Sequence, residues 1–310
     1  MNNFHPAHIT RATFQALLTR YPATVEAVTR RKATNRVLQA SIRGKRGKRV
    51  SPPPPGQDPE LDEEQKKQVE AEIEAYRELD ALRYEGLPGV AAEKQCLEKE
   101  EVLKLVEWKL KHGVFRPTLL GMVKANQPKT VQKATSDAFT TTGEEEETDT
   151  ASFPKTSLDA LVKPLRGVGI ATASLLLSVG TLRDPEHEAP FYSDDTYLWL
   201  CLETFPGTVG QESGDTLGKK GGKFKRNGEI NVKYDVAEYR ALWTAVNELR
   251  ARLNETGDSA LGRVSCADVE KVAFVLRHLG VSGYGDLGDH EANPGSKRKR
   301  VEEEQTGGRK

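Results

Sequence analysis

Two aspartates, Asp194 and Asp195, stand next to each other after Ser193, and a pair of carboxylates can take part in acid–base chemistry. A buried carboxylate can stabilise positive charge that develops on a nearby atom during a reaction, and it can orient or deprotonate an attacking water. Neighbouring carboxylates repel each other, so one of them can have a raised pKa while the other has a structural part. The plainer alternative is that Asp194 caps the helix expected over Tyr197–Cys201.

The sharpest local pattern lies shortly before these aspartates, in Leu165-Arg-Gly-Val-Gly-Ile-Ala-Thr-Ala173. Gly167 and Gly169 bracket a single apolar residue, which lets the chain reverse in a tight turn between a short helix and an apolar helix starting near Ile170. Because no side chains stand in the way, backbone N–H groups at the start of the second helix can approach a phosphate closely. Val168 is expected to anchor the turn in the interior.

This pattern resembles the helix-hairpin-helix of the DNA glycosylase superfamily, and the Ser-Asp-Asp segment is similar to that of its alkylation-damage members. The resemblance spans residues 95–283 in helical layout and is specific over about 161–200. It implies DNA-backbone binding at the hairpin, where a monovalent cation is often bound, and requires no other cofactor. It implies Asp195 as the catalytic aspartate, with Asp194 as the fallback. The backbone-binding residues would be Gly167, Val168, Gly169, Ala171 and Thr172, supported by Lys163 and Arg166.

The sequence also departs from the superfamily pattern. Ala171 stands where bifunctional glycosylase–lyases carry their lysine nucleophile, so a Schiff-base lyase is not expected. The three cysteines are scattered and cannot hold a four-cysteine iron–sulfur cluster, and the histidines show no metal-ligand spacing. The spacer before the aspartates is longer than usual through residues 183–188, and a Gly/Lys-rich insertion at 207–231 interrupts the usual continuation of the pattern.

Base excision also needs aromatic surfaces, because the target base must leave the helical stack to be reached. The candidates for a base pocket are Tyr192, Tyr197 and Trp108, with Phe191 and Trp199 as further aromatic residues nearby. Each of them could equally belong to the protein core. Trp108 in particular could fill the interface between two helical lobes.

Two classes of function therefore stay open. One is a monofunctional DNA glycosylase, and the other is a non-catalytic DNA-binding module, such as a chromatin or repair adaptor. The enzyme needs a carboxylate that faces a pocket beside the hairpin, whereas the adaptor would leave both aspartates as helix caps or surface groups. A third alternative, a helical protein–protein scaffold, would bury the hairpin glycines against protein.

The elements that must position these residues are helices, since no alternating strand pattern is long enough to build a sheet. Asp58 starts a helix that Gly86-Leu-Pro-Gly89 ends, and capping boxes start two late helices at Asp235 and Ser265, with Gly280 closing the second. We predict an all-α, two-lobe, glycosylase-like fold. Its expected helices cover about 10–40, 58–85, 98–112, 116–124, 156–165, 170 onward, 235–253 and 265–279.

Charge is balanced, with 46 basic and 46 acidic residues, so overall charge gives no argument for nucleic acid. Lys297–Arg300 favours a nuclear location, the longest apolar stretch is too short for a membrane span, and a monomer is expected. The expected organisation is an N-terminal helical segment (1–42), a basic, Pro-rich linker (43–57), a helical region (58–135), an acidic loop (136–155), the helix-hairpin-helix region (156–283) and a tail (284–310). The linker, the loops and the tail are expected to be disordered.

Overall fold

The structure is a computed structural model that describes residues 4–46 (41–46 by backbone alone), 61–141, 153–206, 223–224, 230–255 and 262–284. These residues are mostly helical, and their one β-type pairing is an isolated antiparallel bridge between Phe224 and Ile230. The prediction of an all-α protein is confirmed at this level. The expected linker from residue 47 onward, much of the acidic loop and insertion, and the tail with Lys297–Arg300 lie outside the described residues.

Along the chain the helices are α1 (Arg11–Leu18), α2 (Tyr21–Arg46), α3 (Glu63–Ala81), a π-helical turn η1 (Leu82–Gly86), α4 (Leu87–Lys94), α5 (Lys99–His112), α6 (Leu119–Lys124), α7 (Pro128–Thr140), α8 (Lys155–Val162), α9 (Ile170–Gly180), α10 (Asp194–Leu200), α11 (Val236–Glu255), α12 (Cys266–Arg277) and a 3-10 turn η3 (Leu279–Val281). From α3 to α7 the helices follow one another with short connections, as expected for helical domains, whereas α8, α10 and α11 each follow a longer segment.

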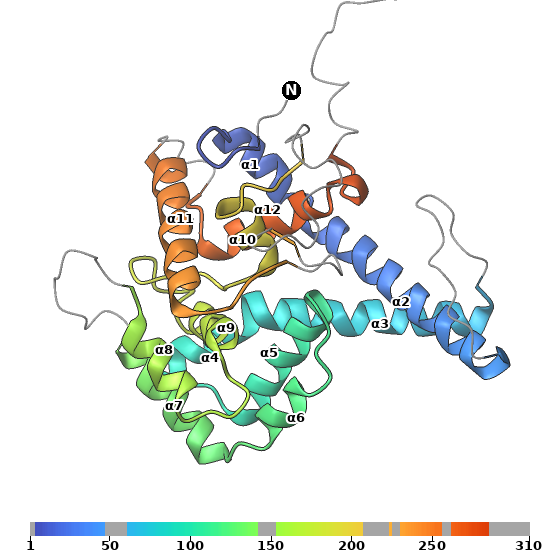
Figure 1. Cartoon of the computed structure of the whole chain (residues 1–310), viewed down its shortest axis with the longest axis horizontal. Coiled ribbons are helices and arrows are strands. Elements are labelled where there is room, and N and C mark those ends of the chain that lie inside the picture. The colour runs from blue at the N-terminus through green and yellow to red at the C-terminus, as the bar shows by residue number, and fades with distance from the viewer. Residues whose placement is uncertain are drawn as a thin grey trace, which may run out of the picture.

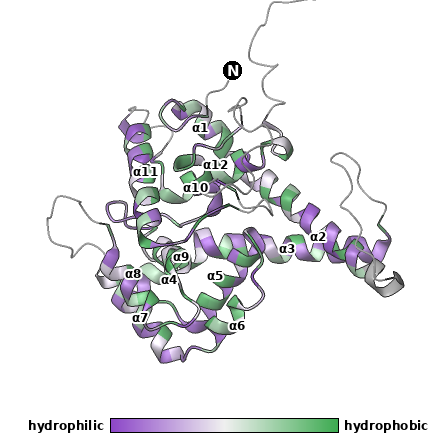
Figure 2. Cartoon of the chain, viewed as in Figure 1, coloured by the Kyte–Doolittle hydropathy of each residue, from purple (hydrophilic) through white to green (hydrophobic). Residues whose placement is uncertain are grey.

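The helices pack around one continuous apolar core as two groups of neighbours, and one pair of helices projects from it (Figure 1). Helices α1, α10, α11 and α12 form one group, and α4 to α9 form the other. Helices α2 and α3 run side by side as an arm that extends from the body, held by a small apolar seam of Ala33, Val37, Val69 and Ile73. Figure 2 shows hydrophobic and hydrophilic residues alternating along the helices, as amphipathic packing requires.

Several helix ends differ from the sequence prediction. Helix α3 is capped by Asp62, whose side chain accepts from the Gln65 N–H at 2.8 Å, while Asp58 lies outside the described residues. The predicted break at residues 86–89 is wrong, because the chain continues through η1 into α4 with Pro88 in the first turn, where a missing N–H does no harm. Helix α7 continues to Thr140, inside the expected acidic loop, and α12 ends at Arg277, before Gly280.

The N-terminal segment closes against helices from the far end of the chain. The Trp199 indole N–H donates to the Phe4 carbonyl at 2.8 Å. The Arg252 guanidinium donates to the Pro6 carbonyl at 2.6 Å and to the Ile9 carbonyl at 3.0 Å. The group that contains α10 and α11 therefore needs residues from both ends of the described chain.

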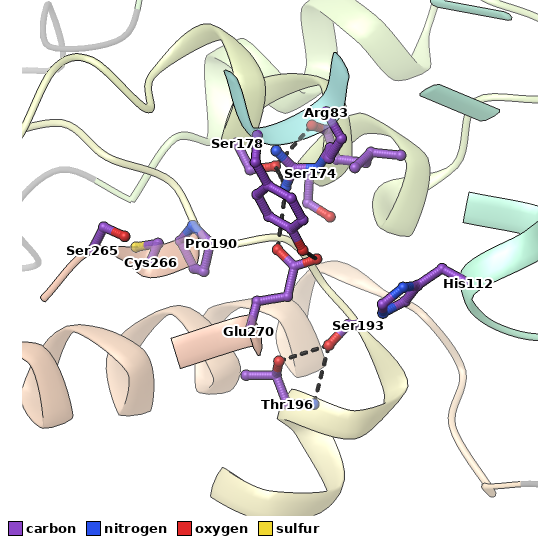
Figure 3. Close-up of polar contacts among 12 residues, drawn as sticks. Arg83, His112, Ser174, Ser178, Pro190, Ser193, Thr196, Ser265, Cys266 and Glu270 are labelled. Carbon is purple, nitrogen blue, oxygen red and sulfur yellow. Dashed lines mark hydrogen bonds and ion pairs between the residues drawn. The ribbon is translucent and has the colours of Figure 1, made fainter. Parts of the chain in front are cut away.

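Two buried charge clusters hold the interior together. Arg83 of η1 donates to Ser178 of α9 at 2.7 Å and to Glu270 of α12 at 3.2 Å, so it ties the two helix groups (Figure 3). Arg250 of α11 pairs with Glu188 at 2.5 Å, and both side chains are almost completely buried. Because each buried charge has a partner of opposite sign, neither cluster leaves an unpaired ion in the interior.

Candidate functional site

The turn between α8 and α9 has the backbone that its glycines predict. Gly167 has a φ of +80°, which L-residues with a side chain rarely adopt. A Cβ at this position would also lie 2.8 Å from the Met122 Cβ of α6. Gly167 is therefore required twice, by its backbone conformation and by its close approach to α6.

Gly169 differs from Gly167 in its surroundings. It is the N-terminal cap residue of α9, with extended backbone, and a Cβ there would meet no atom within 4 Å. Within the described residues, the backbone N–H groups of Gly169, Ile170 and Ala171 have no hydrogen-bond acceptor. Unpaired donors at the positive end of a helix dipole form a ready anion site, and here they open onto space.

Asn126, which the sequence patterns do not single out, holds the turn by side-chain hydrogen bonds. The Asn126 side chain accepts from the Arg166 N–H at 2.8 Å and donates to the Arg166 carbonyl at 2.9 Å. It also donates to the Val123 carbonyl at 2.9 Å, which joins the turn to the end of α6. A lone asparagine after a short helix carries no recognisable motif, so only the three-dimensional contact identifies its role.

The other residues expected to bind DNA backbone occupy different environments. Val168 and Thr172 are buried, and Val168 anchors the turn as expected. Ala171 is half-buried on the first turn of α9, and the side chain of Arg166 is exposed. Lys163 is exposed and pairs with Asp159 at 3.2 Å, so its charge is partly compensated within the protein.

A cavity of about 670 Å³ opens beside the hairpin. Its wall combines both helix groups with the arm: α5, the hairpin, the start of α10, the end of α12 and Lys32 of α2 all contribute. Gly167, Gly169, Ala171 and Thr172 line it, and so do both aspartates. The structure therefore brings the hairpin and the carboxylates, about 25 residues apart in sequence, to one space of the size that ligand pockets usually have.

Neither aspartate is needed to cap α10. The cap is Ser193, whose hydroxyl accepts from the Thr196 N–H at 3.1 Å (Figure 3), so the alternative that Asp194 caps this helix is wrong. Asp194 instead accepts a hydrogen bond from the Tyr234 hydroxyl at 2.8 Å. Both carboxylates stand in the first turn of α10 and face the cavity.

The Asp195 carboxyl is largely withdrawn from water, with 20% of its side chain exposed. This burial raises its pKa to about 7, and the neighbouring Asp194 charge acts in the same direction. The Arg277 guanidinium opposes the shift, from 3.9 Å between its Nε and the Asp195 Oδ1. Near neutral pH Asp195 can therefore both hold and release a proton, as a group acting as general acid and base must.

Lys109 of α5 brings an amine to the same cavity. Its Nζ donates to the Ala171 carbonyl at 2.7 Å, in the first turn of α9, and lies 5.1 Å from the centre of the Phe191 ring. Burial lowers the pKa of this lysine to about 7, opposed by the Asp194 charge and assisted by that of Arg116. Lys109 falls within the helix expected over residues 98–112, and no sequence pattern indicates that its amine turns inward.

His112, one turn further along α5, is a buried neutral group on the cavity wall. Its Nδ1 lies 2.5 Å from the Tyr76 hydroxyl, and its ring stacks on Trp108 with 4.5 Å between ring centres. Burial lowers the pKa of His112 well below its usual value, and the nearby positive charges of Lys32 and His278 add to this effect. In Figure 3 its ring points from α5 toward Ser193.

The predicted base-pocket aromatics are divided between wall and core. Trp108 and Tyr192 line the cavity, although both side chains are almost completely buried. Tyr197 is not part of the lining. Trp199 is a core residue, and Phe191 lies on the wall. Tyr234, which the sequence patterns did not single out, is the half-buried aromatic residue of the wall that also contacts Asp194.

An exposed aromatic residue stands at the rim. Val114 and Arg116, between α5 and α6, line the cavity, and Phe115 between them is 70% exposed. Val114 next to it is 48% exposed, so the two residues form a small exposed apolar patch, and such patches often mark interaction sites. The spacing of this loop gives no sequence motif that predicts its role.

The cavity wall is richer in positive than in negative charge. Five lysines and arginines line it against two carboxylates: Lys32, Lys109, Arg116, Lys233 and Arg277. The part of the chain that the structure describes holds no cluster of three or more metal-ligating side chains. None of the described helices is both long and apolar enough to span a membrane.

Comparison of the chain with protein-family models, curated proteins and solved structures finds no match.

Proposed function

We propose that this protein binds DNA through its hairpin and removes a damaged base as a monofunctional glycosylase, on a two-lobe glycosylase-like fold. The observation that supports this most strongly is the shared cavity: unpaired backbone donors at the start of α9 and the carboxylates of Asp194 and Asp195 face one space. A non-catalytic adaptor would place these aspartates as caps or surface groups, whereas Ser193 is the cap and both carboxylates line the cavity.

Binding of the DNA backbone is supported by the surroundings of Gly169. A protein–protein scaffold would bury both glycines of the turn, but a Cβ at Gly169 would point into open space. A phosphate can approach its N–H and those of the next two residues, since no acceptor in the described residues occupies them. The positive lining of the cavity favours the same polyanionic ligand, and such contacts position DNA without reading its sequence.

The chemistry assigned to Asp195 is supported by its position and its pKa near 7. As a carboxylate it stabilises the positive charge that develops on the deoxyribose and accepts a proton from the attacking water. Asp194, held by the Tyr234 hydroxyl, adds negative charge next to it. Water supplies the hydroxyl that C1′ gains and the proton that the released base gains, so the hydrolysis balances without a further reactant.

Phe115 supports extrusion of the base. Proteins that kink DNA often insert an apolar side chain between base steps, and such a side chain can fill the gap that a displaced base leaves. Phe115 is the large apolar side chain most exposed among the described residues, and it lies between two lining residues of the cavity. A base that leaves the stack beside Phe115 would enter the cavity next to Tyr234.

The catalytic proposal is tested by base release from duplexes that carry alkylated, deaminated, oxidised or mismatched bases. Asp195→Asn is expected to reduce release by about 10²–10⁴-fold, the usual contribution of a general acid or base. Asp194→Asn tests the fallback, and Asp137→Asn is the matched control because Asp137 is a surface residue paired with Lys133. If the wild-type protein binds these duplexes but releases none of the bases, the adaptor function replaces the enzyme.

The binding proposal needs its own variant. Gly169→Asp places a negative charge where a phosphate is expected, and we expect it to abolish binding that otherwise weakens steeply with salt. Gly280→Asp is the control, because a Cβ at Gly280 also meets nothing within 4 Å but lies outside the cavity lining. Equal binding by the two variants would contradict a role of the hairpin in DNA contact.

A further inference from the structure

His112 stands at the end of a buried hydrogen-bond network that starts on α3. One oxygen of this network, Asp80 Oδ1, accepts from the Trp108 indole N–H at 2.8 Å and from the Tyr21 hydroxyl at 3.0 Å. The Tyr76 hydroxyl donates to the same oxygen at 3.3 Å and lies 2.5 Å from the His112 Nδ1. Trp108 and His112 line the cavity, whereas Asp80 and Tyr76 lie outside its lining. The network therefore connects α3 with the cavity wall.

The order of donors and acceptors in this network determines which His112 nitrogen carries the proton. An indole N–H can only donate, so Asp80 Oδ1 is an acceptor, and the Tyr76 hydroxyl directs its single proton to it. The Tyr76 oxygen can then only accept from His112, which makes Nδ1 the protonated nitrogen. Burial keeps the ring neutral by lowering its pKa, and in a neutral imidazole the second nitrogen is an acceptor. His112 Nε2 therefore carries a free lone pair.

This free nitrogen opens onto the cavity. No described residue makes a hydrogen bond to Nε2, and Nε2 is not among the buried unpaired side-chain atoms of the described residues. The ring lies between Trp108, with 4.5 Å between ring centres, and Phe274, with 4.4 Å. The His112 carbonyl accepts from the Lys32 Nζ at 2.7 Å, which also holds the backbone in place. The acceptor is therefore fixed in both position and protonation before any ligand binds, as a specific site requires.

We propose that His112 Nε2 accepts a hydrogen bond from the displaced base, and that this contact selects bases that present a ring N–H. This inference rests on the proposed function for the nature of the ligand, whereas the acceptor itself rests on the network alone. Enzymes that extrude a base read it by hydrogen bonds to its Watson–Crick edge. His112 is thus a specificity-determining residue, and Tyr76 and Asp80 are positioning residues that act through it.

The substrate class that fits this acceptor is a deaminated base. Deamination converts a ring nitrogen that accepts, in adenine or cytosine, into a ring N–H that donates, in hypoxanthine or uracil. The parent base would place its own lone pair against that of Nε2 and leave both unpaired, which a buried site disfavours strongly. Normal guanine and thymine also carry a ring N–H, but correct pairing opposes their extrusion, whereas a deaminated base is mismatched with its original partner.

The test measures base release by the full-length protein from duplexes that carry hypoxanthine, uracil, adenine or cytosine at one position. Each base stands opposite a stable abasic analogue, so that none is paired and extrusion is equally easy. We expect His112→Phe, which keeps an aromatic ring between Trp108 and Phe274, to slow release of hypoxanthine and uracil by about tenfold or more. Release of adenine and cytosine should not fall. His187→Phe is the matched control, because His187 lies outside the cavity lining and contacts Asp184.

Tyr76→Phe separates the position of the proton from the presence of the ring. It removes the hydroxyl that accepts from Nδ1, so we expect the preference for deaminated bases to fall although His112 is still present. An equal loss for all bases in either variant would show a structural role and overturn the inference. Nitrogen NMR shifts of His112 in the wild-type protein test the proton directly. A proton on Nε2 would also overturn it, even if neither variant folds.

Free bases separate failure of this inference from failure of the proposed function. If bases are released without preference for the deaminated ones, the function stands and the inference fails. If no duplex releases any base, the catalytic function fails, and binding of free hypoxanthine and free adenine to the full-length protein tests His112 by itself. We expect hypoxanthine to bind about tenfold or more tightly than adenine, and His112→Phe to remove this preference. Equal affinity of the wild-type protein for the two bases would overturn the inference.

Discussion

The packed interior and the cavity wall both hold charged groups away from water, but they treat them differently. In the interior, Arg250 meets Glu188 and Arg83 meets Glu270, so each of these charges has a counterpart. On the wall, Asp195 has only a distant guanidinium at 3.9 Å, and Lys109 has a carbonyl. Partnered charges serve the fold, whereas under-partnered charges keep reactivity at the expense of stability.

The two uncharged glycines of the hairpin also differ in whether they have close neighbours. Gly167 is fixed by neighbouring atoms of α6, whereas Gly169 borders empty space. Changes in the interior are therefore expected to lower stability, and changes on the wall to lower function while stability falls less or rises. Variants of the two regions test this difference, from the largest expected effect to the smallest.

The largest effect is expected from breaking an interior pair. Arg250→Met leaves the buried Glu188 carboxylate without its partner, and we expect a loss of about 3–5 kcal/mol in the free energy of unfolding. Adding Glu188→Gln should recover part of this loss, because the unpaired charge is then removed. Denaturant unfolding of the wild type, the single variant and the double variant measures it. A single variant as stable as the wild type would contradict the assignment of this pair to the interior.

Removal of a charge from the cavity wall should raise the free energy of unfolding instead of lowering it. The folded pKa of Asp195 is raised from 3.8 to about 7, so its contribution to stability is lost as the pH rises through this range. Asp195→Asn should therefore be more stable than the wild type at about pH 8, by up to a few kcal/mol. The difference should vanish below about pH 4, where Asp195 is protonated in both states. Unfolding measured across pH decides this, and a destabilised Asn variant at high pH would argue for a structural role.

The stability of Lys109→Met relative to the wild type should change with pH in the opposite direction. The folded pKa of Lys109 is lowered from 10.5 to about 7, so its contribution to stability is lost as the pH falls through that range. Lys109→Met is expected to gain stability relative to the wild type at about pH 7, and to lose that advantage toward about pH 10. Thermal unfolding at the two pH values is sufficient. A difference that does not change with pH would mean that folding leaves the pKa of this amine unshifted.

The two glycines allow a smaller but cleaner comparison. Gly167→Ala should lower stability by at least about 1–2 kcal/mol, because alanine is strained at positive φ and its Cβ would crowd Met122. Gly169→Ala should cost less, about 0.5–1 kcal/mol, because alanine is a poorer N-cap residue than glycine but its Cβ would meet no atom. Denaturant unfolding of both variants gives the comparison. Equal costs at the two positions would show that Gly169 is also packed in solution.

The smallest effect on stability is expected at the rim, where binding is the property that should change. Phe115→Ala should weaken DNA binding by about 1–3 kcal/mol, the usual effect of losing one aromatic contact with a base. The free energy of unfolding should stay unchanged, since Phe115 is mostly exposed. Val281→Ala, an exposed apolar position outside the cavity lining, provides the control for binding. Unchanged affinity in Phe115→Ala would contradict the proposal that this side chain inserts between bases.

Local sequence patterns predicted local structure well. The capping box at Ser265 and the hairpin turn occur as expected, because each depends on residues only a few positions apart. At Asp235 only half of the predicted capping box forms: the Asp235 side chain accepts from the Glu238 N–H, but the Glu238 carboxylate accepts from the Lys233 and Tyr234 N–H groups instead. The continuation through η1 was missed because a π-helical turn has no clear sequence signal. The remaining differences arise from the tertiary structure.

The site shows the same limit more clearly. The hairpin and the aspartates could be found from spacing, but the groups that complete the cavity come from distant segments. The amine of Lys109 reaches the carbonyl of Ala171 from 62 residues away in sequence. Asn126 and Tyr234 likewise reach the hairpin and Asp194 from 40 residues away. A side chain that arrives from another helix is invisible to any pattern within one segment.

The closing of the N-terminal segment on late helices has a consequence for synthesis on the ribosome. The hydrogen bond to the Phe4 carbonyl forms only after Trp199, 195 residues further on, has been synthesised. The hydrogen bond to the Pro6 carbonyl likewise requires Arg252. Helices α4 to α9 contact one another over shorter sequence distances and can assemble as they emerge. The group with α1, α10 and α12 completes only when the C-terminal helices have been made. The cavity therefore forms last, and a chain cut short before α12 would display the hairpin without Arg277 beside Asp195.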